Sequence, residues 1–333
     1  MSFFIYLDQN SLSDLRQRKI EETGNKQFKL LRLALESEQV RLVYSHVTLE
    51  EIFQIPKREY KNEHIELLVQ LNAIYIEPLT LKLNEKSPKD IWSAFLENKQ
   101  SNIDMGIDSL ISISQLFWRK MSGLPVEKNF TEIHDQLKDS LNDLLTNCEA
   151  QLSSIDQSSL SEAEKKSFIK IKHPISYLRK KASTLRPFEI NSGQQLGPQP
   201  FREMPEIKSM DIKNMDPALV VREIEHIFKL ENSSFNLEEY FERTPQTDVA
   251  RAYSLMNWAG YYADDFTRVK KGKDRFNASN NDMQHAIAAL GASFLVSNDV
   301  NFRKKAEACF AYVSCPTIVC SPKEFVEQHC VFV

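Results

Sequence analysis

The sequence predicts an α/β protein in which a parallel sheet is interrupted by a long helical segment. Short apolar runs alternate with amphipathic helical patterns over residues 1–85 and again over 246–333, as is typical of parallel sheets covered by helices. Between them, residues 86–245 have mainly helical periodicity. The length of 333 residues also favours two domains over one.

The first segment predicts the order strand, helix, strand, helix, strand. Its three apolar runs are FFIYLD at 3–8, VRLVYS at 40–45 and AIYIEPL at 73–79. An amphipathic pattern covers 28–38, and TLEEIFQI at 48–55 opens a second helix. This alternation predicts parallel neighbouring strands.

The middle segment, 86–245, is expected to be an all-helical insertion. Between residues 130 and 148 apolar side chains recur at every third or fourth position, as on the buried face of a helix. Asp216 followed by Pro217 is typical of a helix N-terminus. Residues 186–207 are rich in Pro, Gly and Gln and lack periodicity, which predicts a long loop.

The last segment, 246–333, returns to the alternating pattern. Helical patterns fall at 248–265, 281–290 and 302–311. The apolar runs SFLVSND at 293–299 and YVSCPTIV at 312–319 predict two strands. Ser321 and Glu324 have the spacing of a capping box at the start of a C-terminal helix.

Composition excludes several classes of protein. Apolar residues (42%) and charged residues (26%) occur in the proportions of a globular protein with a large core. A net charge of −4 excludes a uniformly basic nucleic-acid coat, although a local basic patch acts over about one Debye length, ~8–10 Å.

No apolar run approaches the ~18–20 residues of a membrane span, and the apolar N-terminus is too short for a signal sequence. We therefore expect a cytoplasmic protein without a membrane partner. Five cysteines without a CxxC pair predict reduced thiols rather than a zinc site.

Acidic residues follow the ends of the predicted strands. Asp8 ends the first strand, Asp299 ends the strand at 293–299, and Glu51 lies in the first turn after the strand at 40–45. Ligands of parallel α/β sheets bind outside the carboxyl ends of the strands, so these acids are expected on the functional edge. Asp282 opens the helix that precedes the Asp299 strand, and the pattern alone does not place it at that edge.

Five stretches of the sequence resemble the PIN-domain nucleases. They are IYLDQNSL at 5–12, SHVTLEEI at 45–52, NNDMQHAIAA at 280–289, FLVSNDVNF at 294–302 and PTIVCSPKEFV at 316–326. The resemblance covers 1–85 and 246–333, about half of the chain. It implies a PIN-like, three-layer α/β/α domain that the helical insertion interrupts.

In that family four acids at one edge of the sheet hold divalent metal for the hydrolysis of RNA phosphodiesters. The matching positions in this sequence are Asp8, Glu51, Asp282 and Asp299. Two features depart from the compact family pattern: the whole insertion separates Glu51 from Asp282, and the usual hydroxyl-x-Asp motif reads Ser-Asn-Asp at 297–299.

The resemblance implies Mg²⁺ or Mn²⁺ as cofactor and a metal-dependent endoribonuclease, of a kind that often serves as a toxin or defence effector. The chemistry agrees, because both ions prefer oxygen ligands and clustered carboxylates raise one another's pKa unless a cation neutralises them. Two alternatives stay open: a nuclease that acts on DNA or on a flap structure, and a catalytically silent PIN-like scaffold that binds RNA or a protein. The insertion would select substrate, form a homodimer or contact a regulatory protein.

Most of these residues also have a structural interpretation. Asp8 and Asn10 can cap a turn or the following helix. Thr48 and Glu51 have the spacing of a capping box, which leaves Glu50 as the competing ligand.

The same holds for the helix around Asp282. This acid can stabilise a helix N-terminus by ~0.3–1 kcal/mol. His285, three residues later, can contact a substrate phosphate or serve a structural role. The remaining candidates for substrate contact are Asn10, Asn298, Lys270, Lys271, Lys273, Arg275 and Arg303. Their basic members belong to charge runs, which are either solvated faces or phosphate contacts.

Overall fold

The computed structural model describes residues 3–37, 39–156, 158, 160–183, 197–231, 243–264 and 275–329. The chain divides into two compact units. Unit 1 comprises Met1–Phe95 and Pro198–Val333, and unit 2 comprises Leu96–Gly197.

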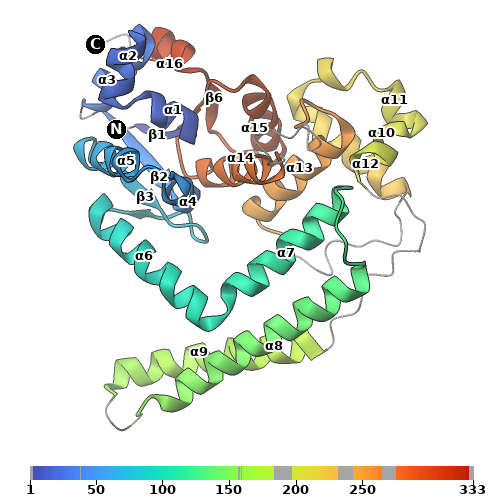
Figure 1. Cartoon of the computed structure of the whole chain (residues 1–333). Helices are drawn as coiled ribbons and strands as arrows, with labels where there is room; N and C mark the ends of the chain where they lie inside the picture. The colour runs from blue at the N-terminus through green and yellow to red at the C-terminus, as the bar shows by residue number, and fades with distance from the viewer. Residues whose placement is uncertain are drawn as a thin grey trace. The chain divides into compact units, whose positions relative to one another are not determined.

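Unit 1 is built around a six-stranded sheet (Figure 1). Its strands are β1 (Phe3–Leu7), β2 (Val40–Ser45), β3 (Ile74–Ile76), β4 (Leu83–Asn84), β5 (Phe294–Val296) and β6 (Ile318–Cys320). They lie in the order β4-β3-β2-β1-β5-β6, and every neighbouring pair is parallel except β3 and β4. The predicted α/β class with a mainly parallel sheet is therefore confirmed. Because β1 pairs with both β2 and β5, residues from distant parts of the chain meet at the centre of the sheet.

Helices of unit 1 pack against both faces of the sheet. One hydrophobic core lies against α12 (Pro217–Glu231), α13 (Pro245–Ala259), α14 (Phe276–Ala289) and α15 (Val300–Tyr312). The other lies against α1 (Gln9–Asp14), α2 (Gln17–Thr23), α3 (Lys26–Leu35), α4 (His46–Gln54), α5 (Arg58–Gln70) and α16 (Pro322–His329). Tyr6 joins the first core, whereas Ile5 and Leu7 join the second, as the two-residue period of a strand requires. All three are at most 2% exposed, which explains why the N-terminal run is continuously apolar.

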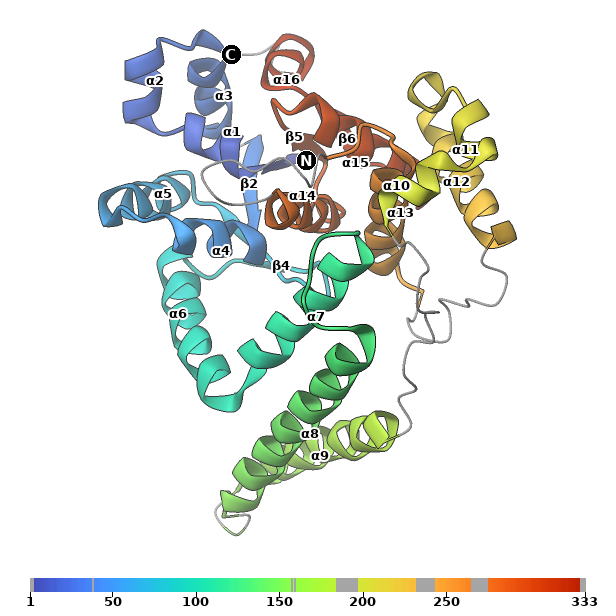
Figure 2. The same cartoon turned by 45° about the vertical axis from the view of Figure 1, so that its right-hand side comes forward.

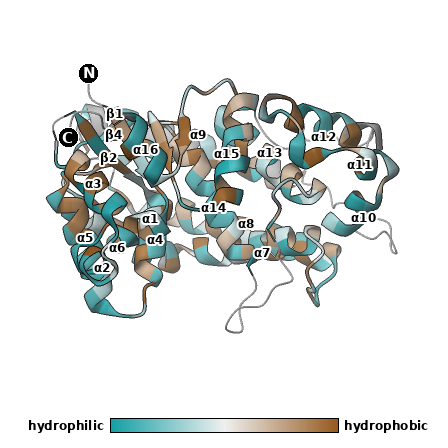
Figure 3. Ribbon diagram, turned by 90° about the horizontal axis from the view of Figure 1, so that it is seen from above, coloured by the Kyte–Doolittle hydropathy of each residue, from teal (hydrophilic) through white to brown (hydrophobic). Residues whose placement is uncertain are grey.

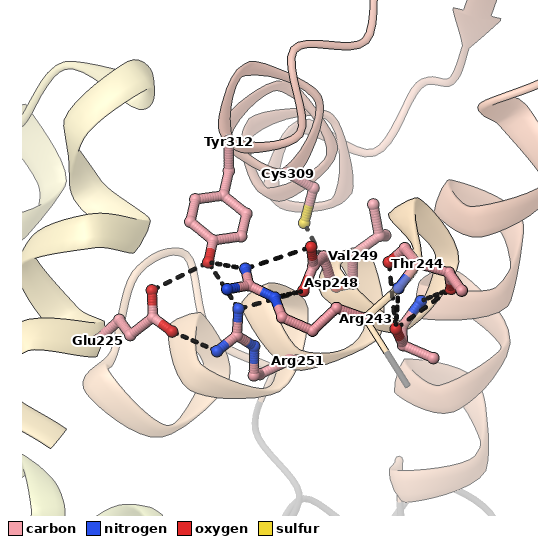
Figure 4. A network of polar contacts seen from close by, with 9 residues as sticks. Glu225, Arg243, Thr244, Asp248, Val249, Arg251, Cys309 and Tyr312 are labelled. Carbon is pink, nitrogen blue, oxygen red and sulfur yellow. Dashed lines mark hydrogen bonds and ion pairs between the residues drawn. The ribbon is translucent and has the colours of Figure 1, made fainter. Parts of the chain in front are cut away.

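The division between the units falls within the segment 86–245. α6 (Pro88–Met105) begins in unit 1, and α10 (Pro198–Glu203), α11 (Pro205–Ser209), the short 3-10 helix η2 (Ile212–Asn214) and α12 also belong to unit 1. A polar network joins α12 to α13 and α15 (Figure 4). Arg251 of α13 forms an ion pair with Glu225 of α12, and Tyr312 of α15 donates to the same carboxylate over 2.9 Å. The Tyr312 hydroxyl also accepts from Arg251 over 2.6 Å. These contacts anchor α12 to the sheet-bearing unit.

The predicted loop over 186–207 is wrong where the structure describes it. From residue 198 onward the chain forms α10 and α11. Pro198 and Pro205 open these helices, at a position where the missing N–H leaves no bond unmade. Phe201 and Ile207 are buried, so tertiary packing supports two helices that are too short to form alone. Residues 186–196 lie outside the described part of the chain.

Unit 2 is helical where it is described. It contains the remainder of α6 together with α7 (Ile107–Met121), α8 (Phe130–Ser154) and α9 (Glu162–Ser183). α8 packs against both α7 and α9 (Figure 2), and a capping box of Asn129 and Glu132 begins it. Hydrophilic and hydrophobic residues alternate along the helices of the chain (Figure 3). Within the described ranges, no helix combines the length and the apolar character that crossing a bilayer requires.

Candidate acid site at the carboxyl edge of the sheet

Asp8 and Asp299 lie at the carboxyl ends of neighbouring strands. β1 and β5 pair in parallel with Leu7 opposite Val296, so Asp8 and Ser297 follow at the same level. The Ser297 hydroxyl donates to Asp8 Oδ2 over 2.7 Å and accepts the backbone N–H of Asp299 over 3.0 Å. Ser297 is fully buried. One hydroxyl group therefore joins the two acids.

Both acids also cap the helix that follows them. Asp8 Oδ1 accepts the N–H of Ser11 over 2.8 Å at the start of α1, and Asp299 Oδ1 accepts the N–H of Phe302 over 2.9 Å at the start of α15. The capping interpretation of Asp8 is thus correct, and Asp299 shares it. Asn10 is an exposed residue of α1. In both carboxylates Oδ1 forms the cap bond, and Oδ2 of Asp8 receives the Ser297 hydroxyl.

Glu51 points from α4 toward α14. Its Oε2 lies 2.8 Å from His285 Nε2, and its Oε1 accepts the side-chain N–H of Asn281 over 2.9 Å. The predicted Thr48–Glu51 capping box is wrong. α4 begins two residues before Thr48, so the capping box consists of Ser45 and Thr48. Glu51 is consequently free of the helix terminus and available to bind α14.

Glu50 faces a different direction from Glu51. Its Oε1 lies 3.2 Å from Nε2 of His46, one helical turn earlier. Successive residues of an α-helix are rotated by about 100°, so only one of the two glutamates can face α14. That residue is Glu51.

His285 is buried between Glu51 and Tyr6. Its Nδ1 lies 2.6 Å from the Tyr6 hydroxyl, which is 2.7 Å from Ser45 Oγ. Burial lowers the pKa of His285, but the Tyr6 hydroxyl and the Glu51 carboxylate outweigh it and raise the pKa to about 10. Burial favours a higher pKa for Glu51 as well, yet its contacts with His285 hold that pKa below the usual range. The two residues form a buried ion pair. Both ring nitrogens of His285 are engaged, one by Glu51 and one by Tyr6, which favours a structural role for this residue.

Asp282 lies in the middle of α14. The helix begins six residues before it, so the interpretation of Asp282 as a helix-terminal charge is wrong. The upstream residues FNASNN are mostly polar, and their lack of apolar periodicity hid the first turns. Burial, and then the carboxylates of Asp264 and Asp299, raise the pKa of Asp282 to about 7. Among the described residues its side chain has no hydrogen-bond or ion-pair partner. The carboxylate of Asp299 is among the charges that act on Asp282.

A fifth acid, Asp264, completes the arrangement. Its Oδ2 accepts from Lys305 Nζ over 2.5 Å and from Ser279 Oγ over 2.6 Å. Lys305 is fully buried; its Nζ also contacts Asn257 Oδ1 at 3.1 Å and lies 4.4 Å from the ring centroid of Tyr253. The hydroxyl of Tyr253 is buried and has no hydrogen-bond partner in the described part of the chain. Asp264 and Lys305 thus form a second buried ion pair beside Asp282.

Sequence reasoning missed Asp264 because the predicted helix extended to residue 265. α13 ends at Ala259, and the following residue, Gly260, caps it with a φ of 95°, a left-handed conformation that favours glycine. Gly260 was the available signal. A helix stop there would have placed Asp264 in a loop rather than on a solvated helix face.

The predicted substrate-contacting residues do not gather into one described patch. Lys270, Lys271 and Lys273 lie outside the described residues. Arg275 forms the N-cap of α14 without a side-chain cap bond. Arg303 Nη1 donates to Glu324 Oε2 over 2.7 Å, which neutralises its charge. Asn298 is exposed next to Ser297 at the carboxyl end of β5.

The donor chemistry of this edge fits a divalent cation in part. Carboxylate oxygens dominate, as Mg²⁺ and Mn²⁺ prefer. Within the described residues, neither the Asp282 carboxylate nor the buried acceptor Oε1 of Gln9, next to Asp8, has a hydrogen-bond partner. Glu51 is already neutralised by His285. In the described ranges, no three acidic, histidine or cysteine side chains are grouped so that they could hold a metal ion.

In the part of the chain that the structure describes, the edge therefore consists of two neutralised pairs and a group of acids without a cationic partner. Glu51 pairs with a histidine and Asp264 with a lysine. Asp8, Asp282 and Asp299 have no such partner among the described residues. No protein-family model, curated protein or solved structure matches this chain.

Proposed function

We propose that the protein is a metal-dependent endoribonuclease with a PIN-like, three-layer domain interrupted by the helical unit 2. One observation carries the proposal: Asp8 and Asp299 are joined through one buried hydroxyl at the carboxyl ends of neighbouring parallel strands, near Asp282, which has no hydrogen-bond or ion-pair partner among the described residues. Mg²⁺ or Mn²⁺ is the proposed cofactor and RNA the proposed substrate. A role as a toxin or defence effector follows only from the resemblance to PIN-domain nucleases.

The chain's own residues prepare this edge for hydrolysis. Ser297 orients Oδ2 of Asp8 and the backbone of Asp299. Asp282, with a pKa of about 7, gives up its carboxyl proton near neutral pH when positive charge approaches. The Glu51–His285 pair fixes α4 against α14, which carries Asp282. When bound, a divalent cation supplies an activated water and stabilises the leaving oxygen of an in-line displacement.

A second candidate is a catalytically silent scaffold that binds RNA or a protein. Two observations favour it: both carboxylate oxygens of Glu51 are engaged, and no three acids of the described chain are grouped as metal ligands. A nuclease that acts on DNA or on flap structures would use the same acids, because both polymers present the same phosphate. The two nuclease readings differ only in substrate.

The test is cleavage of labelled single-stranded RNA and DNA in Mg²⁺, in Mn²⁺ or in EDTA. The variants Asp8→Asn and Asp299→Asn remove charge but keep an amide oxygen that can still cap α1 and α15, so folding is expected to survive. Asp139→Asn, at an exposed position of α8, is the matched control. RNA cleavage that needs metal and both acids supports the proposal. Cleavage of DNA alone supports the alternative substrate, and RNA binding without cleavage supports the scaffold. Cleavage in EDTA, or at the wild-type rate in Asp299→Asn, would contradict the metal site.

A further inference from the structure

Lys305 is a fully buried lysine at the acid edge that the proposed chemistry does not use. A buried ammonium group is strongly unfavourable unless it is paired and hydrogen-bonded. Lys305 has three favourable contacts: Asp264 Oδ2 at 2.5 Å, Asn257 Oδ1 at 3.1 Å and the face of the Tyr253 ring at 4.4 Å. Its neighbour Lys304 is exposed and contacts Glu307 at 3.1 Å, three residues later on the same helix. Of these two adjacent lysines, only Lys305 lies in a buried polar environment.

The pair of Lys305 and Asp264 lies against the face of α14 that carries Asp282. Ser279 donates to Asp264 Oδ2 over 2.6 Å. Ser279 and Asp282 are three residues apart on α14, a spacing that puts two side chains on the same helix face. The ammonium group of Lys305 is thus part of the charge balance around Asp282.

We propose that Lys305 is an internal cation of the acid site, which takes the place of a second divalent ion and holds Asp264 beside Asp282. The identity of the site rests on the proposed function. Two-metal phosphodiesterase sites place two cations about 3.5–4 Å apart. Here Asp264 and Glu51 already have cationic partners, Lys305 and His285. The remaining acids suffice for one ion, since Mg²⁺ commonly takes one or two carboxylates and completes its shell with waters and phosphate. Lys305 is a positioning residue and does not touch the substrate.

Titration with Mn²⁺, followed by calorimetry and by the electron paramagnetic resonance of the free ion, tests this proposal. Wild-type chain is expected to bind one ion. Lys305→Met removes the charge and keeps an unbranched side chain, so it leaves Asp264 without a cation. This variant is expected to bind a second ion or to bind the first about tenfold more tightly. Lys304→Met, the exposed neighbour, is expected to behave as wild type.

Asp264→Asn is expected to change Mn²⁺ affinity in the direction opposite to Lys305→Met. It leaves the Lys305 ammonium without its carboxylate and close to Asp282, so Mn²⁺ is expected to bind about tenfold more weakly than to wild type. The neutral pair Lys305→Met with Asp264→Asn is expected to return to one ion at near wild-type affinity. A lysine that only packs would not produce changes of opposite sign. If Lys305→Met alone does not fold, Asp264→Asn and the double variant decide the question.

The outcomes separate this proposal from the nuclease itself. Two ions bound to wild type, or unchanged Mn²⁺ binding in both Lys305→Met and Asp264→Asn, would overturn the role of Lys305 even if RNA is cleaved. One ion bound without any cleavage would overturn the nuclease and leave Lys305 as an internal cation. If wild type binds no Mn²⁺, a site gained in Lys305→Met supports the proposal, and no gain refutes it.

Discussion

Replacing His285 with glutamine measures how much its buried pair with Glu51 contributes to folding. The pKa of His285 is raised from the usual 6.5 to about 10. A histidine with a raised pKa contributes stability that is complete below pH 6.5 and is lost as pH rises through 10. At ~1.4 kcal/mol for each pH unit, the whole contribution is about 5 kcal/mol. It falls by about 2 kcal/mol between pH 6 and pH 8.

The assay is denaturant unfolding of wild type and His285→Gln at pH 6, 7 and 8. The difference between their free energies of unfolding is the quantity to follow, because groups that titrate equally in both chains cancel in it. We expect wild type to be more stable at pH 6 and its advantage to shrink by about 2 kcal/mol at pH 8. Glutamine keeps an N–H donor for Glu51, so the variant loses mainly the charge.

His64→Gln is the matched control, because its stability difference from wild type should change with pH in the opposite direction. His64 is also buried, with Nε2 at 2.9 Å from Ser13 Oγ and Nδ1 at 2.6 Å from the carbonyl oxygen of Tyr60. Burial lowers its pKa below 6.5, so its contribution is complete above pH 6.5 and is lost as pH falls. The advantage of wild type over His64→Gln should therefore grow with pH. The charged pair would be refuted if the stability difference between wild type and His285→Gln stayed constant between pH 6 and pH 8. It would also be refuted if that difference grew with pH, as it should for His64→Gln.

Three further predictions concern the acid edge and its substrate. Ser297→Ala leaves a buried carboxylate oxygen of Asp8 without its donor, so denaturant unfolding should reveal a loss of about 1–3 kcal/mol; a neutral effect would mean that this hydroxyl does not organise the edge. Added Mn²⁺ should raise the melting temperature by mass action, and Asp299→Asn should reduce the gain; a melting temperature indifferent to Mn²⁺ counts against a preformed site. Replacing the three lysines of the basic stretch, Lys270, Lys271 and Lys273, by alanine should weaken RNA binding and lower the slope of log affinity against log salt by up to ~0.7 per lost contact. An unchanged slope with lost cleavage would assign these lysines to the support of the site around Asp282.

The positions of Asp8 and Asp299 could be predicted because strand ends are visible in the sequence. Each acid directly follows an apolar run, and parallel strands bring their carboxyl ends to one edge. The sheet class followed from the same runs. Their pairing with one serine hydroxyl depends on the register of Leu7 opposite Val296, which the runs alone do not specify.

Lys305 could not be recognised in the same way. In FRKK, residues 302–305, three cations follow one another, and such a run usually forms a solvated face. Which of them turns inward depends on how α15 packs against α13 and on the loop that delivers Asp264. Neither α13 nor the loop that carries Asp264 lies near residue 305 in the sequence. The start of α14 was missed for a related reason, because its first turns carry few apolar residues and owe their helical form to tertiary contacts.

The central position of β1 has a consequence for the time at which the acid edge forms. The hydrogen bond between Ser297 and Asp8 joins residues 289 positions apart. The entropic cost of closing this loop rises only with the logarithm of its length. Contacts between residues so far apart in the sequence nevertheless form slowly. At a synthesis rate of about 5–20 residues per second, Asp8 precedes Asp299 by ~15–60 s on the ribosome. Throughout that interval β1 lacks its β5 neighbour, and a nascent chain carries only part of the acid edge. Any activity of this edge therefore begins only after β5 has been synthesised and has inserted beside β1.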